Sequence, residues 1–161
     1  MIYINSLMSS YLNSSKDILL ERSLDKGLEN ILEQGFLTIS DCIFLAATFP
    51  ANYDKKSLDK KGIEQDFLDF SGFEASTNKF HIEDFTDQDP FIQSVIFLDK
   101  FKEKWHDNFP LDSLVILVSF QDDDVGRFSI FTFHKNRKNE TVYDPTNIEL
   151  NDEPLYRSFS R

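Results

Sequence analysis

Cysteine, basic residues and long hydrophobic runs are scarce in this sequence, and each shortage excludes a class of protein. The single cysteine, Cys42, cannot form an internal disulfide or half of a CxxC metal-binding pair. No apolar stretch approaches the roughly 20 residues that a membrane-spanning helix requires. The N-terminal sequence carries no positive charge before Lys16 and no long apolar segment, which argues against a secretory signal. We therefore expect a cytoplasmic protein with no membrane contact.

Motifs of the common enzyme classes are also missing. The sequence contains no GxGxxG, P-loop, HExxH or GxSxG pattern, and its five glycines leave little material for a phosphate-binding loop. His81, His106 and His134 lie at unrelated spacings, and none has a second ligand three or four residues away in a metal-binding pattern. The apolar segment around Cys42 indicates a buried, inert thiol. We expect no catalytic residue, no cofactor and no bound metal ion, although an enzyme of unrecognised type stays open.

The shortage of basic residues gives the chain an acidic character. Seventeen Lys and Arg stand against 28 Asp and Glu, for a net charge of -11. This balance argues against binding to nucleic acid or to anionic membranes, because such binding requires Lys and Arg to replace counterions. It favours solubility and fast association with a basic protein. A plain alternative is that many cytosolic proteins are simply acidic.

The chain has enough apolar material for one domain covering residues 1–161. Hydrophobic residues make up 40% of the sequence and include 17 Phe, which suits a single packed core at this length. Helical spacing predicts one helix over residues 15–35, capped by Ser15 and ended by Gly35. Residues 4–13 are expected to form a short helix or an extension of that helix. Further helices are expected over residues 39–49 and 63–73, with an exposed connector at 51–62.

The strongest local signal is Asp89 followed by Pro90, an N-cap and a first helical residue. From there a helix with one apolar face is expected to reach about Asn108. Residues 79–85 have the alternation of a short strand.

The last third of the chain changes to strand patterns. Apolar runs rich in β-branched residues predict strands at 113–120, 126–134 and 140–144, joined by short loops at 121–125 and 135–139. The last residues add a short edge strand or a final turn. The predicted fold class is α+β, with a helical N-terminal half packed on a C-terminal antiparallel sheet of three to four strands. The basic segment 134–139 is expected to be a solvated hairpin tip, with Arg137 pairing to Glu140, rather than part of a nuclease.

Most of the acidic excess lies in one segment. Residues 81–124 carry three basic and eleven acidic side chains. Asp89 is accounted for as a helix cap, and Asp87 as a contributor at the positive end of the helix dipole. Three consecutive aspartates at Asp122–Asp124 repel one another without improving the turn. They fit a solvated turn, a patch that binds a cationic partner, or a metal site, although the spacing of an EF-hand loop is absent.

The segment "LVILVSFQDDDVGRFSIFTFHKNRKNETVYD" (Leu114–Asp144), with "FLDKFKEKW" before it, resembles bacterial immunity proteins of contact-dependent growth inhibition and polymorphic toxin systems. The resemblance implies a non-enzymatic inhibitor that is monomeric when free. It would neutralise a cognate toxin domain, of a basic nuclease type, by stoichiometric occlusion. An acidic inhibitor can imitate nucleic-acid phosphates and needs an apolar anchor as well.

Two acidic segments within this region, residues 81–90 and 121–124, supply the expected partner-binding residues together with one aromatic neighbour: Glu83, Asp84, Phe85, Asp87, Asp122, Asp123 and Asp124. For Phe85 a place in the core is the competing interpretation. Two other functions stay open. One is a small-ligand-binding protein or enzyme with a cleft between the helices and the sheet. The other is an adaptor for a ribosomal or nucleic-acid-associated protein.

Overall fold

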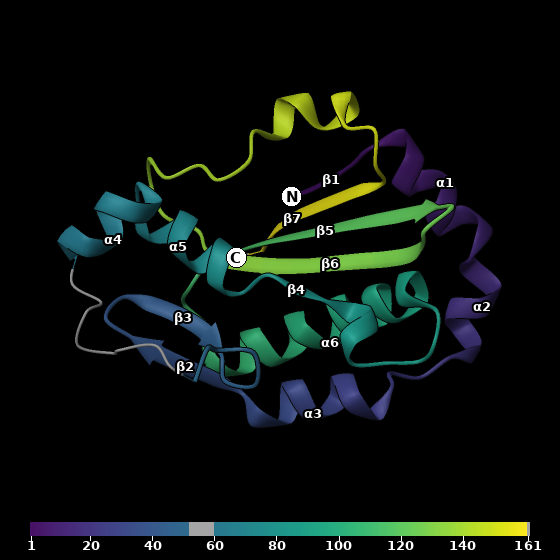
Figure 1. Cartoon of the computed structure of the whole chain (residues 1–161), viewed down its shortest axis with the longest axis horizontal. Helices are drawn as coiled ribbons and strands as arrows, with labels where there is room; N and C mark the ends of the chain where they lie inside the picture. The colour runs from purple at the N-terminus through teal and green to yellow at the C-terminus, as the bar shows by residue number, and fades with distance from the viewer. Residues whose placement is uncertain (52–59, 161) are drawn as a thin grey trace.

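The computed structural model describes residues 1–51 and 60–160. Its centre is an antiparallel sheet of five strands in the order β1-β7-β5-β6-β4, and a separate hairpin is formed by β2 and β3 (Figure 1). The α+β class is therefore confirmed, with more strands than the three to four expected. None of the helices in the described residues is long and apolar enough to cross a membrane.

The first half of the chain contains these elements: β1 (Ile2–Ile4), α1 (Ser6–Ser14), α2 (Lys16–Glu21), α3 (Lys26–Gln34), β2 (Phe36–Ile39), β3 (Cys42–Leu45), α4 (Lys60–Phe67) and α5 (Phe70–Thr77). The second half contains these: β4 (Phe80–His81), the 3-10 helix η1 (Ile82–Asp84), α6 (Pro90–Asn108), β5 (Leu114–Asp123), β6 (Gly126–Lys135), the 3-10 helix η2 (Pro145–Leu150) and β7 (Leu155–Ser160).

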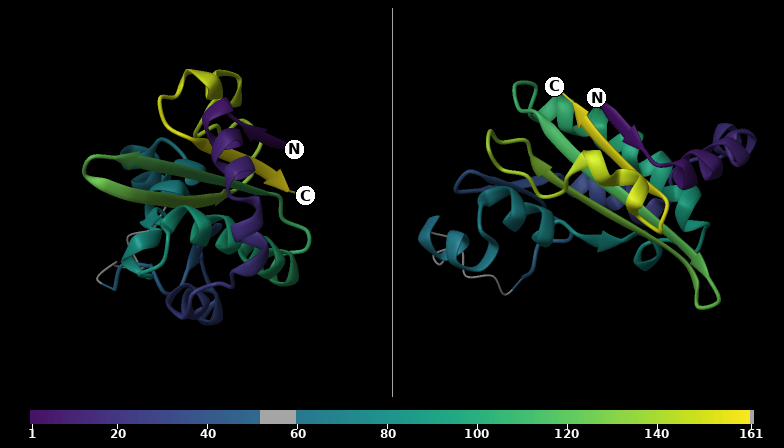
Figure 2. Two further views of the ribbon diagram at one scale, coloured as in Figure 1. Left: turned by 90° about the vertical axis from the view of Figure 1, so that its right-hand side faces the viewer. Right: turned by 90° about the horizontal axis from the view of Figure 1, so that it is seen from above.

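Helix α6 confirms the sequence prediction at both ends. The Asp89 side chain accepts hydrogen bonds from the backbone N–H groups of Phe91 and Ile92, at 2.9 and 3.1 Å. The apolar face of α6 packs on the sheet, where the rings of Phe101 and Phe133 lie 4.7 Å apart between centroids. Helices α6 and α3 thus lie on one side of the sheet, while the segment 136–154 passes over the other (Figures 1 and 2).

The segment 39–49, expected to be a buried helix, forms β3 and the end of β2 instead. All four residues of β3 are buried, so its sequence shows an unbroken apolar run that periodicity cannot separate from a buried helix. The outer edge of β3 is completed by side chains. Glu74 accepts from the backbone N–H of Ile43 at 2.6 Å, and Asn78 accepts from Leu45 at 3.2 Å. This prediction was wrong because its stabilising partners lie some thirty residues away.

The helix expected over residues 15–35 is broken into α2 and α3. Asp25 begins α3, accepting from the N–H of Gly27 at 2.9 Å, while its own N–H donates to the Gln93 side chain at 2.8 Å. A contact with α6 therefore interrupts the helical pattern. Gly35 ends α3 as predicted, with a φ of 71°.

The expected strand at 140–144 is absent, and the chain closes its sheet differently. Residues 140–144 are irregular, with a bend at residues 142 and 143. The strand beside β5 on its other edge is β7, which pairs with β5 from Leu114↔Ser160 to Ser119↔Leu155. β1 then pairs with the outer side of β7. Most of the exposed connector expected at 51–62 lies outside the described residues.

Candidate partner-binding surface

The far end of the β5–β6 hairpin extends beyond the strands on either side of it. β5 pairs with β6 from Leu114↔Lys135 to Asp123↔Gly126, so the segment expected as a loop at 121–125 is mostly strand. On one side, pairing with β7 ends at Ser119. On the other, β4 pairs only with Phe131 and Ile130 of β6. The hairpin therefore projects from the body of the sheet (Figure 2).

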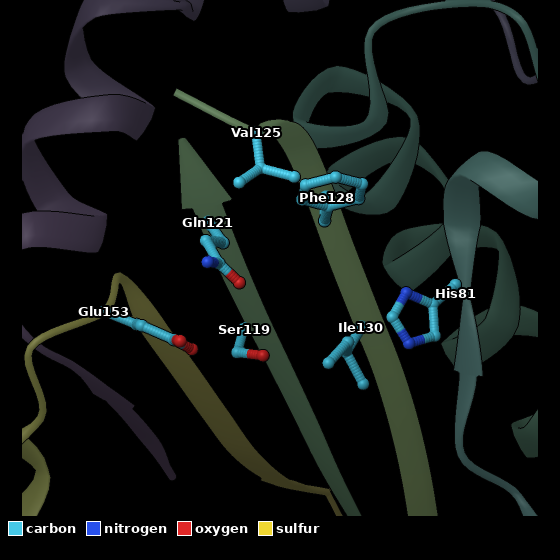
Figure 3. A pocket seen from close by; sticks show the side chains of 7 residues that line it. All are labelled: His81, Ser119, Gln121, Val125, Phe128, Ile130 and Glu153. Atoms are coloured by element: carbon cyan, nitrogen blue, oxygen red, sulfur yellow. The ribbon is translucent and has the colours of Figure 1, made fainter. Parts of the chain in front are cut away.

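An apolar hollow of about 310 Å³ lies on the sheet face along this hairpin (Figure 3). Its lining consists of His81, Ser119, Gln121, Val125, Phe128, Ile130 and Glu153. Phe128 and Ile130 give its apolar surface, and Val125 at the turn is 82% exposed. The hollow thus offers apolar side chains at a projecting, solvent-facing part of the protein.

A second hollow of about 330 Å³ adjoins the first and shares Gln121 and Glu153 with it. It is lined by Leu7, Tyr11, Phe120, Gln121, Asp122, Asp123, Asp152, Glu153 and Pro154. Four of these are carboxylates, and none is Lys or Arg. We call the two adjoining hollows together the hairpin groove.

Asp122 is held in an ion pair that joins the two acidic segments. Its carboxylate lies 3.3 Å from the Nε of Arg127 and accepts a hydrogen bond from the Tyr11 hydroxyl at 3.2 Å. Burial first, and then the charge and hydrogen bond of Asp122, raise the pKa of Tyr11. Arg127 also pairs with Asp89, the cap of α6. The acidic segments, separated in the sequence, therefore meet at one guanidinium.

Asp123 has a structural role in the turn. Its carboxylate accepts hydrogen bonds from the N–H groups of Val125 at 2.8 Å and Gly126 at 3.3 Å, and from the Gln121 side chain at 2.5 Å. The bond from Gln121 and those from the backbone lower the pKa of Asp123. The carboxylate therefore stays ionised while it fixes the turn.

Glu83 also has a local structural role. One of its carboxylate oxygens lies 2.7 Å from the Nδ1 of His81, and the other accepts from the N–H of Ser129 at 3.0 Å. This side chain completes the outer edge of β6 just past the end of β4. It thereby places the imidazole of His81 at the rim of the apolar hollow (Figure 3).

The other residues expected at the surface fall into two groups. Asp84, Asp87 and Asp124 are exposed, and their side chains form no hydrogen bond or ion pair with residues that the structure describes. Of these, Asp124 lies at the hairpin turn, whereas Asp84 and Asp87 lie on the β4 side, away from the second hollow. Phe85 is half-buried, with its ring edge-on to Phe80 at 5.6 Å, and packs on the core.

Sequence reasoning missed Asp152 and Glu153, which precede β7. They lie about thirty residues beyond the acidic turn and join it only because β7 pairs with β5. The signal available was the short acidic run "NDEP" ahead of an apolar strand. In the described part of the chain, no group of three or more His, Cys, Asp or Glu side chains is placed to hold a metal ion.

The basic segment 134–139 is not the solvated tip that was expected. His134 is 4% exposed, and the Arg137 side chain is 10% exposed. Arg137 pairs with Glu74 rather than with Glu140, whose carboxylate accepts from the N–H and hydroxyl of Ser71 instead. The prediction was wrong because α5 covers this end of β6 and supplies a buried carboxylate.

Comparison with known proteins assigns the chain to a family. The sequence profile described as "Uncharacterized protein PM0498 family" matches residues 3–158. The chain is similar to "Uncharacterized protein PM0498" of Pasteurella multocida (strain Pm70), with 38% identity over 144 residues, covering 89% of each chain. No solved structure matches. The profile spans nearly the whole chain, which therefore belongs to the Uncharacterized protein PM0498 family.

Proposed function

We propose that this protein is a non-enzymatic inhibitor that binds a basic partner protein in the hairpin groove. The observation that carries the proposal is the composition of the groove. One hollow has an apolar surface, the adjoining hollow is lined by four carboxylates, and no Lys or Arg among the described residues lines either. Such a surface suits a partner with a cationic patch beside an apolar side chain.

The two hollows serve different steps of association. A net charge of -11 steers a basic partner toward the protein, and the carboxylates at the groove fix its orientation. Charge alone gives little affinity at physiological salt, because exposed ion pairs are screened. The exposed Val125 and the half-buried Phe128 supply apolar contact area that screening does not weaken.

In its specific form, the proposal is that the partner is a toxin domain and that the protein confers immunity in the cytoplasm of a bacterial cell. The likeness of residues 114–144 to immunity proteins supports this form. A nuclease-type toxin has a basic cleft for nucleic acid, which an acidic groove complements. Occlusion would be stoichiometric, with one monomeric inhibitor for each toxin domain.

The test is calorimetric titration with the C-terminal domain encoded immediately upstream of this protein's gene. We expect one-to-one binding at nanomolar affinity, weakening at least tenfold when salt is raised from about 0.05 to 0.3 M. Binding that is unaffected by salt would contradict the acidic mechanism. No binding to that domain would contradict the toxin-specific form.

A second candidate function is binding of a small apolar ligand. An apolar hollow of about 190 Å³ lies between α1, α6 and the sheet, where Lys102 donates to the Tyr156 hydroxyl at 2.7 Å. This is the cleft between helices and sheet that the alternative interpretation requires. It predicts that the natively purified protein retains a small molecule. Native mass spectrometry showing only the mass of the chain, 18.8 kDa, would contradict it.

A further inference from the structure

The second hollow exposes an unpaired strand edge as well as carboxylates. The N–H of Phe120 donates to the carbonyl of Pro154 at 3.0 Å, so the backbone polar groups of Phe120 point toward β7. Because these groups alternate along a strand, the N–H and C=O of Asp122 point the same way. β7 does not extend that far, so no described strand pairs with Asp122 on this side of β5.

The neighbouring strand gives an independent check on this direction. Asp122 lies opposite Arg127 in the β5–β6 pairing. The N–H of Ser129, two residues from Arg127, points away from β5 and donates to Glu83 at 3.0 Å. The backbone groups of Arg127 and Asp122 therefore form no hydrogen bonds with each other, and those of both residues face outward from the hairpin.

The charges around this edge of β5 determine which kind of segment can pair with it. Asp122, Asp123, Asp152 and Glu153 all line the hollow that contains this edge. A second copy of the chain would bring the same carboxylates against them, and like charges directly opposite one another destabilise strand pairing. A segment rich in Lys or Arg has the complementary charge.

We propose that the partner presents an extended basic segment that adds to the edge of β5 at Asp122, antiparallel to β5 and in line with β7. This inference rests on the proposed function and names its mode of recognition. Side chains of an added strand alternate between the two faces of the sheet. One set would enter the apolar hollow beside Gln121, and the other would lie beside Asp122 and Tyr11.

The test uses two synthetic peptides and the full-length ¹⁵N-labelled protein. The probe is an eight-residue peptide of alternating Lys and Val with blocked ends. Its matched control carries methyl groups on every second backbone nitrogen, which keeps charge and side chains but removes the donors of one edge. We expect the probe to shift the Asp122 amide proton downfield and to bind about tenfold more tightly than the control.

Each result of the peptide experiment supports or overturns strand addition. Equal affinity of the two peptides, or shifts that spread over the acidic side chains without the Asp122 amide, would overturn strand addition. No binding of the probe would also overturn it. Neither result contradicts the proposed function, because the charged surface of a folded partner domain can bind without adding a strand. The titration with that domain tests the proposed function separately.

Discussion

Arg137 and Glu74 form a bidentate ion pair inside the protein. The two guanidinium nitrogens lie 2.8 and 3.0 Å from the two carboxylate oxygens, and Glu74 is fully buried. The same carboxylate accepts from the N–H of Ile43 at 2.6 Å and of Lys135 at 2.8 Å. Burial raises the pKa of Glu74, and the bonds to Arg137 oppose that shift. One side chain of α5 thus joins the β2–β3 hairpin to β6.

Replacing this carboxylate is expected to destabilise the fold strongly. Glu74→Gln leaves the half-buried Arg137 guanidinium with only the exposed Asp41 as a counter-charge, which costs about 3–5 kcal/mol of unfolding free energy. Urea unfolding measures the change. The control is Glu103→Gln, which removes an exposed pair with Lys100 and should cost less than about 1 kcal/mol. Equal losses in the two variants would show that the buried pair contributes no more than a surface one.

Stability is expected to fall on mild acidification because of His134. Burial lowers its pKa, and the nearby charges of Arg157 and Arg137 act in the same direction, against its hydrogen bond to the Lys135 carbonyl. A histidine with a lowered folded-state pKa stays neutral in the fold, whereas the unfolded chain takes up a proton below pH 6.5. The stabilising effect is therefore complete above that pH and is lost as the pH falls, by up to about 1.4 kcal/mol per pH unit.

Urea unfolding between about pH 7.5 and 5 checks this prediction. His134→Gln cannot titrate, so its stability should fall less over that range than the stability of the wild type. His106→Gln, at an exposed site near the end of α6, should keep the wild-type dependence. A parallel pH dependence in the wild type and His134→Gln would assign the effect to other groups.

Cys42 is expected to be unreactive in the folded protein. Burial, followed by the charge of Glu74, raises the pKa of its thiol to about 12, and the side chain is fully inaccessible. Because the thiolate is the reactive form, a thiol-specific chromogenic reagent should release colour only when denaturant unfolds the chain. Full reaction within minutes under native conditions would contradict the placement of β3 in the interior.

Gly27 is expected to tolerate no side chain. A Cβ at this position would clash with the backbone carbonyl of Phe85, where the start of α3 meets the segment before α6. Gly27→Ala should therefore lower the unfolding free energy by about 1–3 kcal/mol, although alanine favours helices. Lys26→Ala, exposed in the same turn, should change it by less than about 0.5 kcal/mol. Thermal unfolding of both variants provides the comparison.

Neutralising three free carboxylates of the hairpin end is expected to weaken partner binding without harming the fold. In the described structure the side chains of Asp124, Asp152 and Glu153 form no hydrogen bond or ion pair, unlike Asp122 and Asp123. The triple amide variant should keep wild-type thermal stability, lose at least tenfold in affinity for the upstream-encoded domain, and show less dependence on salt.

A matched variant controls for net charge in that experiment. Glu33→Gln, Asp66→Asn and Asp107→Asn change the charge equally at exposed sites on α3, α4 and α6. Their effect on affinity should be small. If both triple variants weaken binding alike, total charge rather than the hairpin groove determines affinity.

Elements with local signals were predictable from the sequence. Asp89, Pro90 and a sustained apolar face define α6 within the helix itself, and the long apolar runs define β5 and β6. The β2–β3 hairpin was not predictable, since side chains of α5 complete its edge. The burial of the basic segment 134–139 was not predictable either, because its buried partner Glu74 is remote in sequence.

Only part of the candidate partner-binding surface was predictable from the sequence. The charge count located Asp122–Asp124 as an acidic turn, but it could not show that Arg127 and the turn hydrogen bonds occupy two of the three carboxylates. Nor could it bring Asp152 and Glu153 beside them, because that placement depends on β7 entering the sheet next to β5.

The position of β7 also governs how the protein can fold as it emerges from a ribosome. β1 pairs only with β7 in the described sheet, so Ile2–Ile4 stay without a strand partner until residues 155–160 have been synthesised. Contacts between such distant segments form late and slow folding. The β5–β6 hairpin and α6 can pack together earlier, while the edge of β5 that β7 later covers is still open. Chain growth, rather than local sequence, therefore sets the order in which this sheet is completed.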